Sequence, residues 1–125
     1  MQFEGSIRFS ILEKTKDKVI GEMPIHPGIK NPYGVVHVGA ILWFADVCAT
    51  VLVFGGSTPA AEGQEGFPLA INLNSNFASN QSEGTFKAVS SFVKRGRTVS
   101  IVRTMVFGDG DKLIADVTTN HILAK

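Results

Sequence analysis

The sequence predicts an α+β fold in which one antiparallel sheet of five to six strands wraps around a single long central helix. Two observations favour this class. Residues 31–54 combine a turn-rich entry with an apolar stretch long enough for a buried helix. Elsewhere, apolar and polar residues alternate in short runs, which is typical of strands. A helix that is apolar on nearly all sides needs a sheet that curves around it.

The composition indicates a compact globular protein. The chain has 125 residues, 44% of them hydrophobic and 18% charged, which predicts a single domain over residues 1–125. A net charge of +1 argues against a nucleic-acid partner. The N-terminus lacks the pattern of a signal peptide and Cys48 is the single cysteine, so we expect a reduced, cytoplasmic setting. Asp46 inside the apolar stretch argues against a membrane span.

Two strands are expected before the helix. Residues 6–12 and 19–25 alternate, and the charged residues 13–18 form the turn between them. Pro24 predicts an edge position near the end of its strand, because proline cannot donate to a sheet ladder. Residues 26–34 hold too many glycines and prolines for regular structure.

The helix is expected from about His37 to Phe54, where Gly55 and Gly56 provide a stop signal. Residues 57–66 read as a polar loop, which we expect to be the most mobile part of the chain. Four more strands are then predicted, at residues 68–78, 84–94, 98–107 and 112–123. The resulting order is β-β-α-β-β-β-β.

The carboxylate of Asp46 is out of place in this helix. Burying a carboxylate costs free energy unless the group has a partner or a chemical role. One interpretation is that Asp46 activates water as a base or attacks a carbonyl as a nucleophile. The structural alternative is that the carboxylate is hydrogen-bonded to backbone or to Thr50, one turn further along.

The start of the helix offers a second chemical group. The N–H groups of Val38 and Gly39 fall in its first turn, unpaired within the helix, and can polarise a carbonyl. Val38 and Asp46 are eight residues apart, about 12 Å of helix rise. A reacting carbonyl makes contacts of about 3 Å, so both groups can act on it only if one comes from a second copy of the chain. The uncovered flank of the helix also predicts a partner subunit.

Other polar residues have structural interpretations as well. His37 beside a helix start is commonly a cap, and Asn31 before a proline is commonly a turn former. The basic turn at residues 94–97 is either solvated or binds the phosphates of a nucleotide-bearing substrate. His26 and His121 show no ligand spacing with His37, so no metal site is expected.

The pattern N-x-x-G-x-x-H-x-G, followed by A-D on an apolar helix, resembles the hotdog-fold acyl-CoA thioesterases. It is most similar to the PaaI-like branch of the 4-hydroxybenzoyl-CoA thioesterase superfamily. The matching residues are Asn31, Gly34, His37, Gly39, Ala45 and Asp46. The Arg95-Gly96-Arg97 turn and the ending GDGDKLIADVTT extend the resemblance, which covers most of the chain from residue 20 onward.

This resemblance implies a hotdog fold, homodimers that often pair into tetramers, and hydrolysis of an acyl-CoA thioester without a metal or dissociable cofactor. Asp46 would be the base or nucleophile, and the Val38 N–H would polarise the carbonyl, with Asn31 and His37 shaping the site. The pantetheine and nucleotide arm of CoA would lie along the turn from Arg95 to Thr98. The substrate-binding positions are then Gly39, Ala70, Arg95, Gly96, Arg97 and Thr98.

Two positions depart from the family pattern. Val38 stands where relatives have the middle glycine of H-G-G, and Ala70 stands where they commonly carry Ser or Thr, a hydroxyl that might orient Asp46 or the water. These departures keep open a non-catalytic acyl-CoA-binding module, either a sensor or a carrier. A hotdog hydratase or dehydratase is a third hypothesis, in which His37 and Asp46 would have to pair across subunits.

Overall fold

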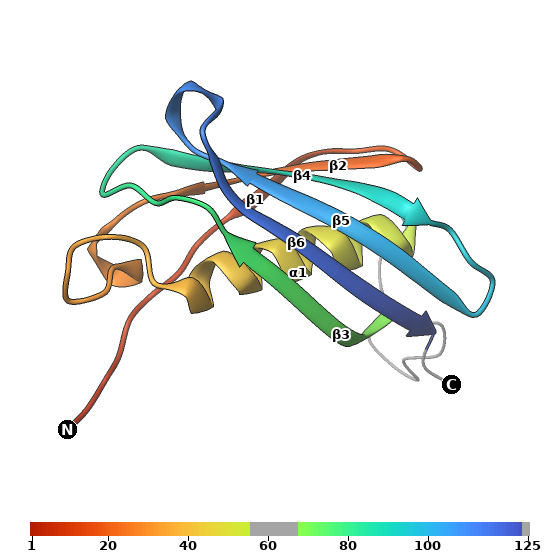
Figure 1. Cartoon of the computed structure of the whole chain (residues 1–125), viewed down its shortest axis with the longest axis horizontal. Coiled ribbons are helices and arrows are strands. Elements are labelled where there is room, and N and C mark those ends of the chain that lie inside the picture. The colour runs from red at the N-terminus through yellow and green to blue at the C-terminus, as the bar shows by residue number, and fades with distance from the viewer. Residues whose placement is uncertain (56–67, 124–125) are drawn as a thin grey trace.

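The computed structural model contains one six-stranded antiparallel sheet and one long helix, and it describes residues 1–55 and 68–123. The elements are β1 (Ser10–Lys14), β2 (Lys18–Pro24), the short 3₁₀ helix η1 (Pro27–Ile29), α1 (Val38–Phe54), β3 (Pro68–Phe77), β4 (Thr85–Lys94), β5 (Val99–Phe107), the 3₁₀ turn η2 (Asp109–Asp111) and β6 (Leu113–Leu123). The strands lie in the order β1-β2-β4-β5-β6-β3 (Figure 1). The predicted fold class and element order are confirmed, and the predicted loop at residues 57–66 lies outside the described residues.

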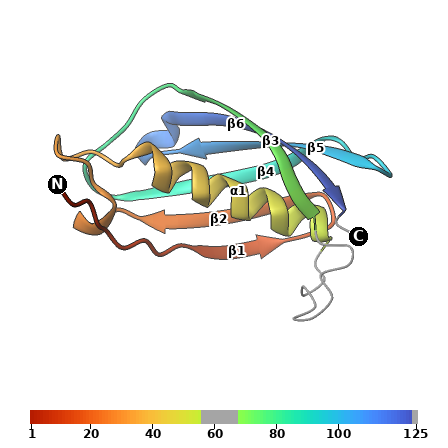
Figure 2. The same cartoon turned by 90° about the horizontal axis from the view of Figure 1, so that it is seen from below.

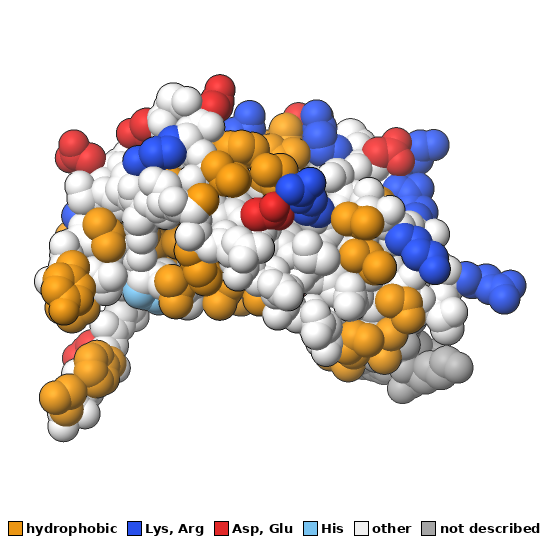
Figure 3. All heavy atoms as spheres, viewed as in Figure 1, with side chains coloured by type: hydrophobic (Ala, Val, Ile, Leu, Met, Phe, Trp, Pro, Cys, Tyr) orange, Lys and Arg blue, Asp and Glu red, His pale blue; other side chains and the backbone are white. Residues whose placement is uncertain are grey.

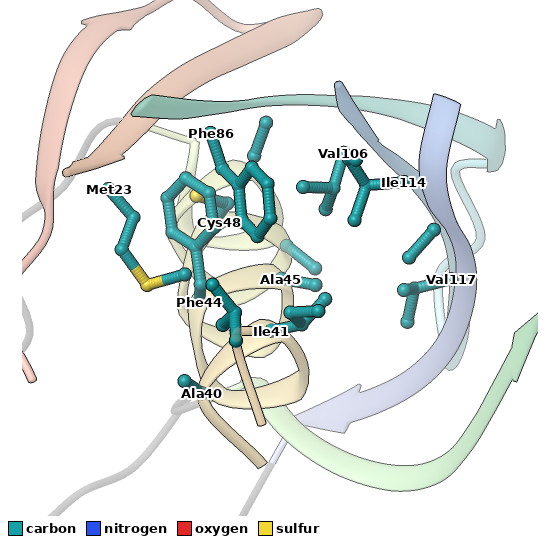
Figure 4. Close-up of a cluster of buried hydrophobic side chains, with 14 of the residues drawn as sticks. Met23, Ala40, Ile41, Phe44, Ala45, Cys48, Phe86, Val106, Ile114 and Val117 are labelled. Atoms are coloured by element: carbon teal, nitrogen blue, oxygen red, sulfur yellow. The ribbon is translucent and has the colours of Figure 1, made fainter. Parts of the chain in front are cut away.

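The sheet curls around α1, which lies along its concave side (Figures 1 and 2). A glycine allows the helix to come close to β2: a Cβ atom on Gly21 would lie 2.7 Å from Cys48 Sγ and 3.0 Å from the ring of Phe44. Figure 4 shows the resulting core, in which Phe44 and Ile41 of α1 meet Phe86 of β4. Alternate residues of the strands therefore point at the helix, as the sequence pattern predicts.

The helix has defined signals at both ends. His37 is its N-cap, and its Nδ1 accepts a hydrogen bond from the Ala40 N–H at 3.0 Å. Gly55 ends the helix in the left-handed conformation, with φ of 71°, which glycine adopts without strain. The helix thus begins one residue later than predicted, because His37 caps it rather than joining it. No helix within the described ranges is long and apolar enough to cross a bilayer.

The start of the chain differs from the prediction. The first strand begins at Ser10 rather than residue 6 and continues to Lys14, so only residues 15–17 form the turn. Residue 6 is engaged elsewhere, because its N–H donates to the Gly28 carbonyl at 3.1 Å. This hydrogen bond joins the N-terminal segment to the loop after β2 instead of to β2 itself.

The predicted edge position of Pro24 is wrong for the strand as a whole, since β2 lies between β1 and β4. The physical reason for the prediction still applies locally. β1 pairs with β2 only as far as Glu22, so Pro24 lies beyond the last paired residue on that side and pairs with Thr85 of β4 on the other. No β1 carbonyl therefore waits for the N–H that proline lacks.

Candidate active site

Asp46 projects from the third turn of α1, between residues of the helix that belong to the core. Its Oδ1 atom is buried and has no hydrogen-bond partner among the described residues. The structural alternative, a hydrogen bond to backbone or to Thr50, therefore fails for this oxygen. Burial raises the pKa of Asp46 above its usual 3.8, and the smaller electrostatic influence of His121 lowers it. A carboxyl group with a raised pKa and one free oxygen is suited to accepting a proton.

The polar residues at the start of α1 are partly occupied by structural hydrogen bonds. Asn31 is a turn former: its Oδ1 accepts hydrogen bonds from the N–H groups of Tyr33 and Val35 at 2.9 and 3.3 Å. His37 uses Nδ1 to cap the helix. The N–H groups of Val38 and Gly39 have no acceptor within the helix, as expected for its first turn. Donors at this end of the helix dipole can stabilise negative charge on a carbonyl oxygen.

The basic turn lies at the opposite end of the molecule. A cavity of about 280 Å³ separates it from the last turn of α1, and Lys16 of the β1–β2 turn also lines this cavity. All four predicted CoA-arm residues of the turn contribute to the lining: Arg95, Gly96, Arg97 and Thr98. Lys and Arg side chains gather at this end (Figure 3). The cavity mouth is thus positively charged and its inner wall includes Leu52 and Phe92.

The two arginines of the turn are not equivalent. Arg95 donates to the carbonyl of Lys16 and to Asp17 Oδ1, the latter at 3.1 Å, and its guanidinium lies 4.2 Å from the centre of the Phe92 ring. Arg97 is exposed and forms no ion pair or hydrogen bond with the described residues. Arg97 is therefore the cation that a phosphate can engage without breaking existing contacts.

One chain does not bring the two chemical groups of the helix together. Val38 begins α1 and Asp46 lies eight residues later, about 12 Å along the axis. Figure 2 shows that no labelled element covers the outer side of α1. Trp43 and Val38 on the helix are 49% and 50% exposed. The site is therefore open on the side where these apolar side chains lie.

Strand β3 borders this open side and is an edge of the sheet. It carries a bulge between Ala70 and Asn72, after which Leu73 pairs with the buried Thr119 of β6. Paired residues point to the same face of a sheet, so Leu73 faces the helix side, yet it remains 39% exposed. An apolar edge strand of this length commonly pairs with another chain.

Sequence reasoning set aside one residue that the structure places beside Asp46. His121 is 1% exposed on the concave face of β6, lines the cavity, and interacts electrostatically with Asp46. It pairs across the sheet with Ala70 and Ser100. The available signal was the alternation of β6, in which His121 falls on the same face as Val117.

Other candidate groups are inert. Burial raises the pKa of the Cys48 thiol to about 12, so it is a core residue as predicted, not a nucleophile. In the part of the chain that the structure describes, no three His, Cys, Asp or Glu side chains are grouped to hold a metal ion.

No protein-family model matches the chain. The curated protein named "Putative esterase ComA2", from Bacillus subtilis (strain 168), is 24% identical over 109 residues, which cover 87% of this chain and 83% of that protein. A mutant of the thioesterase enzyme SAV0944 from Staphylococcus aureus subsp. aureus Mu50 superposes with a TM-score of 0.85 at 19% identity, covering 94% of this chain and 93% of that one. The protein smu.793 from Streptococcus mutans UA159, solved bound to acetyl CoA, gives a TM-score of 0.82 at 19% identity, with 94% and 89% covered.

The thioesterase HI1161 from Haemophilus influenzae is similar over 94% of this chain and 78% of its own, with a TM-score of 0.81 at 16% identity. These neighbours share the arrangement of one long helix enclosed by a six-stranded antiparallel sheet, with the strand order described above. The chain has the hotdog fold of the thioesterase superfamily.

Proposed function

We propose that this protein hydrolyses an acyl-CoA or aryl-CoA thioester to the free acid and CoA. The observation that carries the proposal is Asp46, a carboxylate with a free, buried oxygen and a raised pKa in the middle of an apolar helix. Such a group costs folding free energy and is retained where it performs chemistry. The thioesterase neighbours and the acetyl-CoA complex of the Streptococcus mutans protein support the substrate class.

The reaction has two balanced routes at Asp46. In the first, the carboxylate takes a proton from water, the hydroxide attacks the thioester carbon, the C–S bond breaks, and the protonated Asp46 returns its proton to the CoA thiolate. In the second, the carboxylate itself attacks, CoA thiolate leaves, and water then hydrolyses the mixed anhydride. In both routes the Val38 N–H, with Gly39 beside it, holds the carbonyl oxygen as it becomes negative. Asn31 and His37 hold the loop and helix start that present this donor.

The CoA arm is assigned to the cavity at the basic turn. Its inner wall is partly apolar, which suits pantetheine, and its mouth carries the cations that nucleotide phosphates require. Gly96 is needed in this turn because a Cβ atom there would collide with the carbonyl of Val99. Arg97 is the proposed principal phosphate contact, while Arg95 holds the turn in place.

We further propose that the working form is a homodimer in which Asp46 of one copy meets the helix start of the other. The exposed apolar residues of α1 and the free edge of β3 support this arrangement. It also resolves the separation of about 12 Å between Val38 and Asp46 within one chain. Pairing of two such dimers into a tetramer and a cytoplasmic location stay predictions.

A panel of acyl-CoA and aryl-CoA esters tests the function, with release of the free thiol as the readout. We expect turnover of at least one ester by the wild type and a loss of about 100-fold or more in Asp46→Ala. Activity that persists in Asp46→Ala would remove Asp46 from its proposed role.

A non-catalytic acyl-CoA-binding module is the second candidate. Two observations favour it: the half-exposed Val38 side chain narrows the space beside the donor N–H, and Ala70 supplies no hydroxyl near Asp46. Binding of a CoA ester without any thiol release, measured on the same panel by calorimetry, would support this candidate over hydrolysis.

A further inference from the structure

The buried imidazole of His121 is fixed in place by two neighbours. Its Nε2 lies 2.8 Å from Thr119 Oγ1 and its Nδ1 lies 3.5 Å from the carbonyl oxygen of Pro68. The ring is 1% exposed and forms part of the wall of the cavity at the basic turn. A histidine with two specified hydrogen-bond partners has a defined ring orientation, which is the condition for influencing a neighbouring charge.

His121 also occupies the place where a partner for Asp46 is missing. It lies directly across the sheet from Ala70, the position whose side chain has no hydroxyl to offer. Asp46 Oδ1 is buried without a hydrogen-bond partner among the described residues. Asp46 and His121 interact electrostatically but do not form a direct ion pair. The imidazole therefore acts on the carboxylate through space.

We propose that His121 is a positioning residue of this site, which keeps the Asp46 carboxylate ionised for proton transfer while Thr119 holds the imidazole ring. The proposal rests on the proposed function, in which Asp46 is the base or nucleophile. It assigns to His121 and Thr119 of β6 the supporting role that a hydroxyl at residue 70 cannot play. His121 does not itself exchange a proton with the substrate.

The direction of the electrostatic effect follows from the two groups. Burial lowers the pKa of His121 below 6.5, whereas Asp46 raises it in part; burial raises the pKa of Asp46 above 3.8, whereas His121 lowers it in part. In acid, a protonated imidazole thus favours the ionised carboxylate. Ala70 and Ser100 beside His121 do not titrate, and Cys48 stays a thiol.

The remaining charges near the cavity are Lys16, Arg95 and Arg97 at its mouth. They are common to every variant below, so they contribute equally to each comparison.

The first test is the pH dependence of kcat/KM for a CoA ester that the wild type hydrolyses. His121→Gln keeps a hydrogen-bonding side chain but carries no charge, so the acid limb should move to higher pH. A displacement of one pH unit lowers kcat/KM about ten-fold on that limb. Thr119→Val should give a smaller displacement in the same direction. An acid limb that stays at the wild-type pH in a folded His121→Gln variant would overturn the proposal.

Thr104→Val is the matched control for Thr119→Val. Both threonines are buried on the concave face and each has one side-chain partner, but Thr104 is bonded to Ser90 at 2.6 Å rather than to His121. Thr104→Val should therefore leave the acid limb in place, whatever it does to stability. An equal displacement in both threonine variants would reduce the role of Thr119 to packing.

The second test needs no enzymatic activity, so it separates this proposal from the proposed function. The imidazole titrations of the three histidines are followed by NMR in the wild type and in Asp46→Asn. Because Asp46 raises the pKa of His121, its removal should lower the His121 midpoint and leave His26 unchanged. An unchanged His121 midpoint would overturn the proposal even if the protein is an active thioesterase.

Discussion

Asp46 and Asp116 are two aspartates whose surroundings shift their pKa values in opposite directions. Burial raises the pKa of Asp46. Arg103 donates to both oxygens of Asp116, at 3.0 and 2.7 Å, and this lowers the pKa of that carboxyl group. The ionised carboxylate therefore opposes folding at one position and favours it at the other.

Asp46→Asn is expected to abolish activity and to stabilise the fold at pH 7. Since the folded-state pKa of Asp46 lies above 3.8, ionisation costs no stability below pH 3.8 and reaches its full cost above the raised value. Asparagine removes this cost, with a gain of about 1 kcal/mol at pH 7 that disappears near pH 4. The free energy of unfolding in urea at both pH values measures the gain.

Asp116→Asn is the matched comparison. Its folded-state pKa lies below 3.8, so its contribution to stability is present above pH 3.8 and is lost as pH falls through the lowered value. We expect this variant to be less stable than the wild type at pH 7. An Asp46→Asn variant that is destabilised in the same way would contradict the account of a strained, functional carboxylate.

At this scale the sequence identifies candidate residues but not which of their atoms are free. Spacing pointed to Asn31, His37 and Asp46, yet the structure shows that Asn31 Oδ1 and His37 Nδ1 are engaged in a turn and a helix cap. His121 was missed because its relation to Asp46 depends on strand register, which brings residues 75 positions apart in sequence to one place. No local spacing encodes that contact.

The basic turn between β4 and β5 gives a prediction at the scale of an element. Arg97→Gln should raise KM for a CoA ester about ten-fold without changing stability, because its guanidinium has no partner among the described residues. Arg95→Gln should also lower the free energy of unfolding, by less than about 1 kcal/mol, because it breaks an exposed ion pair and a contact with Phe92. Steady-state kinetics and urea unfolding separate the two effects.

Equal effects of both substitutions on KM, with no change in stability, would contradict the different roles assigned to the two arginines. Pantetheine thioesters that lack the nucleotide are the substrate control. The KM for such an ester should not respond to Arg97→Gln, since the phosphates are absent.

The first residue of α1 gives a second prediction for an element. Val38→Pro removes the donor N–H but suits the first position of a helix, and the extended His37 before it, with φ −71° and ψ 148°, tolerates a following proline. We expect kcat to fall by about 100-fold with little change in stability. Val38→Gly keeps the N–H and should retain activity. Equal activity of the proline variant and the wild type would exclude this donor.

Most elements of the fold could be predicted from the sequence because periodicity and breakers are local signals. The helix from Val38 to Phe54 and the last four strands agree with the predictions within one residue at each end. The first strand was misplaced because a hydrogen bond to Gly28 holds residue 6 away from β2. Pro24 was misplaced because its tolerance depends on where β1 stops, which is a property of pairing rather than of β2 itself.

At the scale of the whole molecule, the exposed edge strand β3 predicts self-association. Leu73→Lys places a charge on the apolar side of β3 that we expect a second copy to cover, and should convert the protein to a monomer. Leu12→Lys is the matched control, because Leu12 is equally apolar and exposed but lies on β1 at the opposite edge of the sheet. Sedimentation velocity over a range of concentrations measures both variants.

A wild-type protein that sediments as a monomer at all concentrations would contradict the proposed dimer. Loss of association in Leu12→Lys but not in Leu73→Lys would place the interface at the wrong edge. With β3 as the interface, Leu73→Lys should also lose activity, because each site then lacks half of its groups.

The central claim is that each site combines Asp46 of one copy with the Val38 N–H of another, and mixing two inactive variants tests it most directly. Asp46→Asn and Val38→Pro are unfolded together, refolded at equal concentration and assayed for thiol release. Random pairing makes half of the dimers mixed, and each mixed dimer has one intact site, so the account predicts about a quarter of wild-type activity. If both groups act within one chain, every site carries a defect, and a mixture as inactive as its components would contradict the account.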